Sequence, residues 1–383
     1  MPRPHELLLD LAAARPPGAV SPPAGVELVR SALEHRMHGL LWSSVEAGLI
    51  VLPQEPMLRL SALDLAVRTH HERLWRTLAD VQRRLATRGV HTAAAKGITA
   101  EQRWYHRVGE RPSMDIDLLV EPGGRGRIAD ILDELHPGHP LRDQIARLVR
   151  RGMLQSVDLI VDGVAIDVHL DLLKVEIPTR SQEAIWSRTR LAGGKKGIEV
   201  RVLDCETSLI HFAIHLNKDR FARLLGYADI ARILGKESLD WEFIHRLVAN
   251  EGLQVPVINS LEAVARTLRL PPLPVPRVRG WRSYAWHRLW PDERRLRGYE
   301  GIAAAQHRQL WIPWLAEGRM KEALWWWIRR RAIPPTDLLQ LHDPDVLGPY
   351  PLRFAIGRLR GWRKRRRAVV VARRAGRGPT RRR

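Results

Sequence analysis

Met114-Asp115-Ile116-Asp117-Leu118-Leu119-Val120 is the stretch of sequence that decides the fold. Acidic and aliphatic residues alternate over its first half and aliphatic residues fill the second, which is typical of a strand with a buried face. Glu121-Pro122-Gly123-Gly124 follows at once and ends the strand, because proline and glycine interrupt regular structure. We therefore predict a strand over residues 114–120 that carries two aspartates.

Asp115 and Asp117 are the residues of this strand that carry chemistry. Positions i and i+2 of a strand point to the same face and lie about 6.5–7 Å apart along the chain. Two carboxylates among aliphatic side chains are costly to bury unpaired. A divalent metal removes that cost, because hard cations take carboxylate oxygens as ligands and bridge them to phosphate. The alternative is a strand end whose carboxylates face water or pair with arginine.

Three features near the aspartate pair favour the metal site. Lys96-Gly97 ends a short predicted strand and begins a helix, where free backbone N–H groups and the helix dipole attract an anion such as phosphate. Arg111 precedes the first aspartate by four residues, within reach of the same anion. Asp167 lies among aliphatic residues in a later predicted strand, residues 164–170. Together they indicate a site that handles a phosphate and a metal.

The order of these elements resembles the polymerase-β type of nucleotidyltransferase superfamily. Within it, the chain is similar to a bacterial branch, the uncharacterised nucleotidyltransferase family. That branch has a Lys-Gly turn, an arginine before the aspartate pair, and an Ile-Asp-x-His strand, here Ile166-Asp167-Val168-His169. The resemblance covers about residues 25–360. Its other matching positions are Tyr105, 211–215, Arg220, 229–234, 239–241, 252–253 and 332–338.

Two positions depart from the family pattern. The superfamily prefers Gly-Ser or Gly-Gly at the phosphate turn, whereas Ile98 follows Gly97 here. The family has an aromatic residue after the Asp-x-His strand, and Leu170 stands there. Neither departure removes a metal ligand, but the first bears on how the triphosphate is bound.

The resemblance implies a Mg²⁺-dependent nucleotidyltransferase. Such an enzyme moves a nucleoside monophosphate from a nucleoside triphosphate, such as ATP, to an acceptor hydroxyl. The acceptor, a small molecule, a peptide or a protein, is not identified by the sequence. The implied catalytic residues, which are also the ligands of two Mg²⁺ ions, are Asp115, Asp117 and Asp167. The implied phosphate-binding residues are Lys96, Gly97 and Arg111.

The two alternatives are a non-catalytic binding or regulatory protein with this fold, and a nucleic-acid-binding protein that uses its basic tail. When an enzyme loses its activity in evolution, a metal ligand is usually replaced first. All three acids are present here, which favours the enzyme.

Without metal, the three neighbouring carboxylates repel one another, so each is expected to lower the stability of the metal-free protein.

The predicted fold class is α+β, with a small mixed-sheet nucleotidyltransferase core between N-terminal helices and a larger C-terminal helical region. We expect four regions: an N-terminal helical region over 1–89, the α/β core over 90–204, the C-terminal helical region over 205–360, and a disordered basic tail over 361–383. The expected strands cover 90–95, 114–120, 156–161, 164–170 and 198–203. The main expected helices cover 26–50, 56–88, 98–107, 127–135, 206–217, 219–235, 240–251 and 255–268. No helix is expected in residues 1–25, because prolines and glycine interrupt them.

Composition limits the partners and the cellular compartment. The 383 residues hold 63 basic and 42 acidic residues, a net charge of +21, but 12 arginines and one lysine of that excess lie in residues 358–383. The charge is thus mainly a property of the tail and is no sign of a nucleic-acid-binding fold. The single cysteine, Cys205, excludes an intramolecular disulfide and cysteine-based metal clusters and fits a reducing compartment. With no apolar run near 18 residues, we expect a cytoplasmic protein without a membrane span.

Three histidines lie in positions that leave two interpretations open. His211 and His215 share one helix face, but the zincin pattern needs glutamate where Phe212 stands, so metalloprotease chemistry is not supported. Packing is the favoured role of this pair, and shaping the substrate cleft is the alternative. His169 either supports Asp167 within the site or only packs behind it.

Overall fold

The structure is a computed structural model of the whole chain. It describes residues 4–16, 22–131, 142–150, 152, 154–173, 177–193, 199–290, 296 and 315–325. The predicted basic tail over 361–383 and the family-like segment 332–338 lie outside the described residues.

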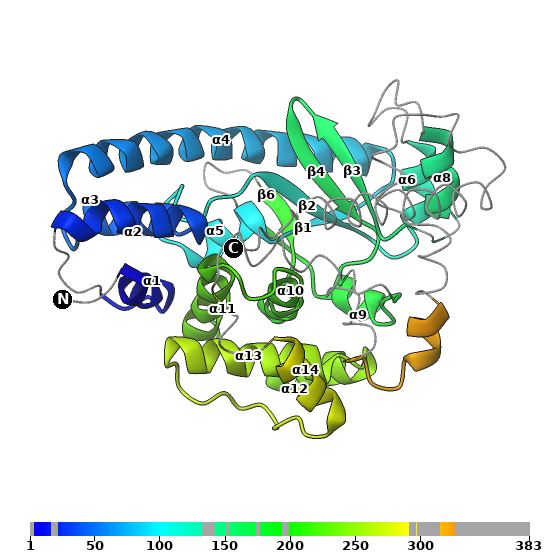
Figure 1. Cartoon of the computed structure of the whole chain (residues 1–383). Coiled ribbons are helices and arrows are strands. Elements are labelled where there is room, and N and C mark those ends of the chain that lie inside the picture. The colour runs from blue at the N-terminus through cyan, green and yellow to red at the C-terminus, as the bar shows by residue number, and fades with distance from the viewer. Residues whose placement is uncertain are drawn as a thin grey trace, which may run out of the picture.

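A six-stranded mixed sheet forms the centre of the fold (Figure 1). Its order is β3-β4-β2-β1-β6-β5, with β2 next to β4 and to β1. The β2–β4 and β1–β6 pairs are parallel, whereas the β1–β2, β3–β4 and β5–β6 pairs are antiparallel. The strands are β1 (Thr92–Ala95), β2 (Asp115–Val120), β3 (Ser156–Val161), β4 (Val164–His169), β5 (Arg190–Gly193) and β6 (Glu199–Val202). The predicted α+β fold class is confirmed, and all five predicted strands are present.

The β3–β4 hairpin follows from its turn residues. Asp162 and Gly163 both have positive φ, +51° and +71°. Two positive φ values are what a two-residue turn needs to match the twist of the strands it joins, which explains the preference for Asp-Gly.

Helices cover both faces of the sheet. The 34-residue helix α4 (Gln54–Thr87) runs along one face (Figure 1). Its buried residues, among them Leu74, Leu78 and Val81, pack against the even-numbered residues of β2 and β4 in one hydrophobic cluster. The opposite face is covered by α5 (Gly97–Trp104) and α10 (Cys205–Lys218). The odd-numbered residues of β2 and β4, including the aspartates, therefore face α5 and α10.

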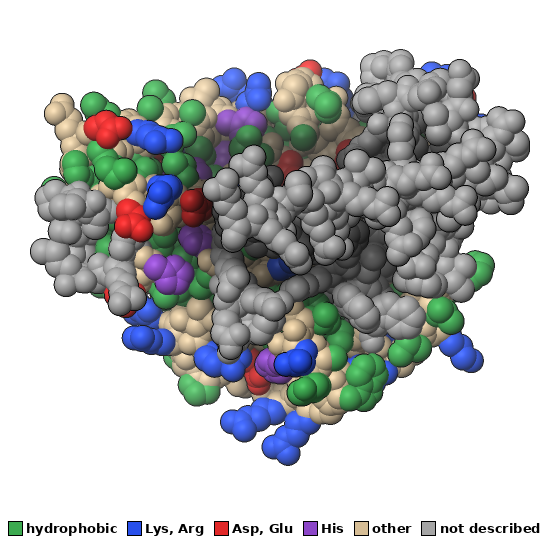
Figure 2. Space-filling view, in the orientation of Figure 1, with side chains coloured by type: hydrophobic (Ala, Val, Ile, Leu, Met, Phe, Trp, Pro, Cys, Tyr) green, Lys and Arg blue, Asp and Glu red, His purple; other side chains and the backbone are tan. Residues whose placement is uncertain are grey.

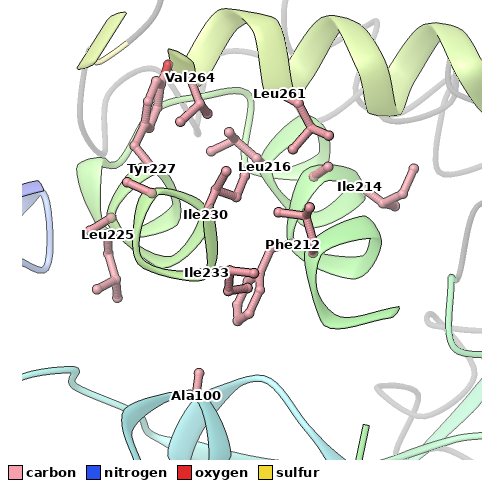
Figure 3. Packing of buried hydrophobic residues seen from close by; sticks show 14 of the residues in the cluster. Ala100, Phe212, Ile214, Leu216, Leu225, Tyr227, Ile230, Ile233, Leu261 and Val264 are labelled. Carbon is pink, nitrogen blue, oxygen red and sulfur yellow. The ribbon is translucent and has the colours of Figure 1, made fainter. Parts of the chain in front are cut away.

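A second, larger cluster joins N-terminal helices, sheet residues and C-terminal helices into one core. In Figure 3, Ala100 of α5 points toward Phe212 and Ile233 of the helical layer. Because this core crosses the predicted boundaries at residues 90 and 205, these boundaries do not separate independent hydrophobic cores. The remaining helices are α1 (Pro4–Ala12), α2 (Pro22–Glu34), α3 (His38–Glu46), α6 (Arg125–Asp130), α8 (Arg142–Arg150), α9 (Gln182–Ser187), α11 (Leu224–Lys236), α12 (Trp241–Asn250), α13 (Gln254–Leu268) and α14 (Trp281–Leu289).

The structure differs from the sequence prediction at the N-terminus. The single predicted helix over 26–50 is broken into α2 and α3 at residues 35–37. Helix α1 forms where none was expected, because Leu7, Leu8 and Leu11 make an apolar stripe that is buried in the core. Burial of that stripe outweighs the prolines nearby, which lie at or beyond the helix ends.

Basic side chains on the surface can be assigned to particular helices of the fold. On the face shown in Figure 2, lysine and arginine side chains project at the lower edge, where Figure 1 places α12 and α14. Of the helices that the structure describes, none combines the length and the apolar character needed to cross a bilayer.

Candidate active site

The pairing of β2 with β4 brings two of the predicted site residues together. These strands are parallel neighbours, and their register sets Asp117 directly beside Asp167 and Leu119 beside His169. All four residues are odd-numbered and point to the α10 side of the sheet. The sheet alone thus assembles carboxylates that are 50 residues apart in the sequence.

Asp117, Asp167 and His169 form a compact cluster. His169 Nε2 donates a hydrogen bond to Asp117 Oδ1 at 2.8 Å and lies 3.4 Å from Asp167 Oδ2. One ligand atom from each of the three residues lies within 4.8 Å of the others. Two carboxylates and an imidazole at this spacing are donors that suit a divalent cation. The interpretation of His169 as a member of the site is thereby favoured over packing alone.

Lys96 is the cationic neighbour of this cluster. Its Nζ donates to Asp117 Oδ1 at 3.0 Å, so that one carboxylate oxygen accepts from both a lysine and a histidine. Burial by itself raises the pKa of Asp117, but Lys96 and His169 together hold it well below the ordinary value. The Asp117 carboxylate is therefore charged and stabilised in the folded protein, contrary to the expected repulsion.

Asp115 lies at the mouth of the site and differs from Asp117. Its side chain is in part exposed to solvent, and it does not belong to the compact three-residue cluster. Partial burial raises the pKa of Asp115, and the charges of Asp117 and Asp167 raise it further while Lys96 opposes them. The expected repulsion between carboxylates thus falls on Asp115.

Asp115→Asn is therefore expected to leave the melting temperature of the metal-free protein at pH 7 unchanged or slightly raised. Folding raises the pKa of this carboxyl, so its ionised form opposes folding above its ordinary pKa of 3.8. Solvent screening at the mouth keeps the effect small. Thermal melts in a chelator should show the gain at neutral pH and its disappearance below about pH 4, where the carboxyl is protonated in both states. A clear drop in melting temperature at pH 7 would mean that Asp115 makes a stabilising contact.

The Lys96-Gly97 turn begins α5 in a strained backbone conformation. Both residues have positive φ, +44° and +37°. A Cβ at position 97 would lie 3.1 Å from Ser113 Oγ, so glycine is the residue that fits there. Thr99, in the first turn of α5, donates its Oγ1 proton to Lys96 O at 2.7 Å. Strain of this kind persists where the surrounding structure fixes it, and it is common at functional sites.

Arg111 is buried and forms an ion pair with Asp229 of α11. Its Nε and one Nη donate to the two carboxylate oxygens of Asp229 at 2.7 and 2.8 Å, and the other Nη donates to Ser113 Oγ at 2.9 Å. Burial alone lowers the pKa of Arg111, but the Asp229 carboxylate raises it above the ordinary arginine value. Arg111 lines the pocket described below, and its contact with phosphate stays a prediction.

A buried histidine–glutamate pair holds the loop that carries Arg111. His71 Nδ1 of α4 and Glu101 Oε2 of α5 are 2.9 Å apart, and His71 Nε2 accepts the backbone N–H of Ser113 at 3.0 Å. Glu101 Oε1 accepts the N–H of Gly109. Because His71 Nε2 accepts, its proton lies on Nδ1 and is donated to Glu101. The loop is thus fixed by two buried hydrogen bonds, one to each helix, and a third links the two helices.

These elements enclose a pocket of about 130 Å³. It lies between the start of β2, the Lys96-Gly97 turn, α10 and the start of α11. The charged and histidine residues that line it are Arg36, Lys96, Arg111, Asp115, Asp117, His215, Asp219, Arg223 and Asp229. All the predicted site residues except Asp167 line this pocket. The sequence analysis did not identify Arg36, Asp219, Arg223 or Asp229 as site residues.

Helix α10 closes the pocket behind the cluster. His211 packs edge-to-face on His169, with ring centroids 5.8 Å apart. Burial lowers the pKa of His211 well below its ordinary value, and Lys96 and His169 lower it further. His211 is therefore neutral and fills space, whereas His215, one turn later, lines the pocket and lies 3.3 Å from Asp219.

Adjacent parallel strands that each carry an inward-facing aspartate, beside a Lys-Gly turn that opens a helix, are the arrangement of elements on which the resemblance in the sequence rests. Residues 26–269 match the family described as uncharacterised nucleotidyltransferase, and the chain belongs to that family. A crystal structure of an antigenic nucleotidyltransferase-like protein from Paracoccidioides brasiliensis is similar over 51% of this chain and 92% of that chain, with 14% identity and a TM-score of 0.30. Among curated proteins, none matches the chain.

Proposed function

We propose that the protein is a Mg²⁺-dependent nucleotidyltransferase that transfers a nucleoside monophosphate from a nucleoside triphosphate to an acceptor hydroxyl. The observation that carries this proposal is the register of β2 and β4, which sets Asp117 beside Asp167, with His169 in contact with both. The carboxylates of Asp117 and Asp167 and the imidazole of His169 fit a divalent cation. Lys96 adds a positive charge beside Asp117 Oδ1. The family membership supports the same class of reaction.

The site residues have distinct roles in the proposed reaction. Asp115, Asp117 and Asp167 would hold two Mg²⁺ ions, which when bound neutralise phosphate charge and lower the pKa of the acceptor hydroxyl. The acceptor oxygen forms a bond to the α-phosphorus, the bond from that phosphorus to the bridging oxygen breaks, and pyrophosphate leaves. Asp167, the more exposed member of the cluster, accepts the proton of the acceptor hydroxyl. Lys96 and the backbone N–H groups after Gly97 offset the charge that builds on the leaving group.

The size of the pocket limits what it encloses. About 130 Å³ is less than the roughly 300–1,000 Å³ typical of sites that enclose a whole ligand. We therefore expect the phosphates and ions to bind inside and the nucleoside and acceptor to extend out over the helical layer.

The proposal is tested by incubation of the protein with each labelled nucleoside triphosphate and Mg²⁺. Thermal melts of the same mixtures should show stabilisation by a triphosphate only when Mg²⁺ is present. Mass spectrometry should then detect an added nucleoside monophosphate on protein, nucleic acid or a metabolite from a cell extract. If no triphosphate stabilises the protein with Mg²⁺ or Mn²⁺, the nucleotidyltransferase proposal is wrong.

The alternative of a non-catalytic protein predicts nucleotide binding without any transfer product. The alternative of nucleic-acid binding through the basic tail predicts an affinity that falls steeply with salt. Both outcomes are separable from transferase activity in the same set of measurements. Residence in the cytoplasm belongs to the enzyme proposal as well, since nucleoside triphosphates and Mg²⁺ are abundant there.

A further inference from the structure

Arg36 occupies a backbone position that usually belongs to glycine. At the end of α2, the N–H of Met37 donates to Ala32 O at 2.7 Å and the N–H of Arg36 donates to Leu33 O at 3.1 Å. This pair of hydrogen bonds is the Schellman motif, whose left-handed residue is most often glycine. Arg36 takes that place with φ +55°. Arg36 therefore adopts a left-handed backbone conformation that an arginine does not favour.

The left-handed conformation by itself does not indicate a function. Arg220 and Arg269 end α10 and α13 in the same way, with φ of +57° and +52°. Arg36 differs from Arg269 in its location, because Arg36 lines the active-site pocket, whereas Arg269 is exposed and is not among the pocket residues. The inference rests on this location.

Arg36 and Arg223 reach the pocket from two elements that are hydrogen-bonded to each other. The N–H of Leu225, in the first turn of α11, donates to His35 O at 3.3 Å. Arg223 is the residue that immediately precedes α11, so it lies beside this junction. Both arginines line the same pocket as Asp115 and Asp117.

The cations of the pocket lie among its acids. Burial raises the pKa of Asp219, but His215 and Arg223 hold it below its ordinary value. Lys96 pairs with Asp117 at 3.0 Å, and Arg111 pairs with both oxygens of Asp229. Partial burial lowers the pKa of Arg36, and the neighbouring Arg223 lowers it further, while Asp219 and Asp115 oppose this. Arg36, Arg223 and Asp219 line the same pocket, and a polyanion bound there adds negative charge to that of Asp219 beside the two guanidinium groups.

We propose that Arg36 and Arg223 bind the β- and γ-phosphates of the nucleoside triphosphate. This inference rests on the proposed function and assigns the part of the substrate that the two arginines hold. Guanidinium groups present paired N–H donors that match phosphate oxygens, which makes arginine suited to this contact. Asp117 and Asp167 mark the end of the site where the α-phosphate reacts. The arginine pair lies on the pocket wall formed by the α2–α3 junction and the start of α11, where the leaving pyrophosphate gains negative charge.

The variant Arg36→Gly tests phosphate binding without an expected loss of folding stability. Glycine favours the left-handed backbone at this position, so the variant should melt at the same temperature as the parent or higher. Its affinity for inorganic triphosphate with Mg²⁺, measured by calorimetry, should fall about 10- to 100-fold, the loss expected for hydrogen bonds to a charged group. Its affinity for adenosine monophosphate with Mg²⁺ should not change.

Arg269→Gly is the matched control, because it makes the same replacement in the same backbone conformation outside the pocket. It should bind both probes as the parent does. If the parent binds triphosphate and Arg36→Gly binds it equally well, the assignment of Arg36 is wrong and the nucleotidyltransferase proposal stands. If Arg36→Gly loses affinity for the monophosphate to the same extent, the arginine pair serves another anion and the assignment is overturned. If the parent itself does not bind triphosphate with Mg²⁺, the proposed function and this inference fail together.

Discussion

Asp167→Asn is expected to abolish nucleotidyl transfer and Mg²⁺-dependent stabilisation by a nucleoside triphosphate, with little change in the fold. Asparagine keeps the shape of the side chain but removes the negative charge that would hold a divalent ion and accept the acceptor proton. Loss of several kcal/mol of charge stabilisation corresponds to a fall in rate of at least about a thousandfold. Single-turnover transfer of a labelled nucleotide measures the rate, and thermal melts with and without Mg²⁺ measure binding.

Asp162→Asn is the matched control for this experiment. It makes the same change in the same hairpin, at an exposed turn residue whose left-handed backbone asparagine tolerates well. This control should retain transfer and Mg²⁺-dependent stabilisation. If Asp167→Asn keeps the parent's rate under the same conditions, Asp167 neither binds the ion nor takes the proton.

Asp117→Asn is a less selective test than Asp167→Asn. It removes the buried charged partner of Lys96 and His169, which should lower the free energy of unfolding by an amount on the order of 3 kcal/mol. The pKa of Asp117 is held below its ordinary value, so its contribution to stability is present above about pH 4 and is lost as the pH falls through the folded-state pKa. A loss of activity in this variant therefore mixes chemistry with folding.

Asp229→Asn is expected to have the largest effect on stability, a loss of about 3–5 kcal/mol in the free energy of unfolding. The substitution leaves Arg111 charged and buried without a counter-ion, because the Asp229 carboxylate holds two of its donors. Asp229 Oδ1 also accepts the hydroxyl proton of Tyr105 at 2.6 Å, so the change weakens a second buried contact. Urea-induced unfolding at pH 7 measures the loss.

Glu242→Gln provides the comparison for this prediction. It breaks the exposed pair between Glu242 and Arg246 on α12, and exposed pairs contribute at most about 1 kcal/mol. The double variant Arg111→Met with Asp229→Leu should recover part of the loss, because no charge is then left buried. A loss below about 1 kcal/mol for Asp229→Asn alone would show that Arg111 reaches water or another acid.

The sequence predicted the sheet well because its strands follow local patterns. Alternation predicted β2 to within one residue, and Asp162-Gly163 predicted the hairpin with its turn. Strand β5 was missed, because three of its four residues are exposed and no alternation of burial reveals it. The break between α2 and α3 was missed for a related reason: it is made by Arg36, where neither glycine nor proline marks the end of the helix.

The site was predictable only in part, because it is assembled by pairing across the chain. Asp115, Asp117 and Asp167 were visible as acids within aliphatic strands, whereas for His169 the sequence left two interpretations open, support of Asp167 or packing. Arg111 was assigned to phosphate, but its partner Asp229 lies 118 residues away in the sequence. No local pattern in the sequence links an arginine before a strand to an aspartate within a distant helix.

The parallel pairing of β1 with β6 sets the order in which the sheet is completed during synthesis. Ala94 pairs with Val202, so 108 residues (202 − 94) separate the partners. At about 5–20 residues per second, a ribosome needs on the order of ten seconds to make that interval. Until then, one edge of β1 has no strand beside it, and an unpaired edge invites contact with other chains. Nascent chains that stop before Glu199 thus leave this edge of β1 unpaired, and β6 covers the edge once it is made.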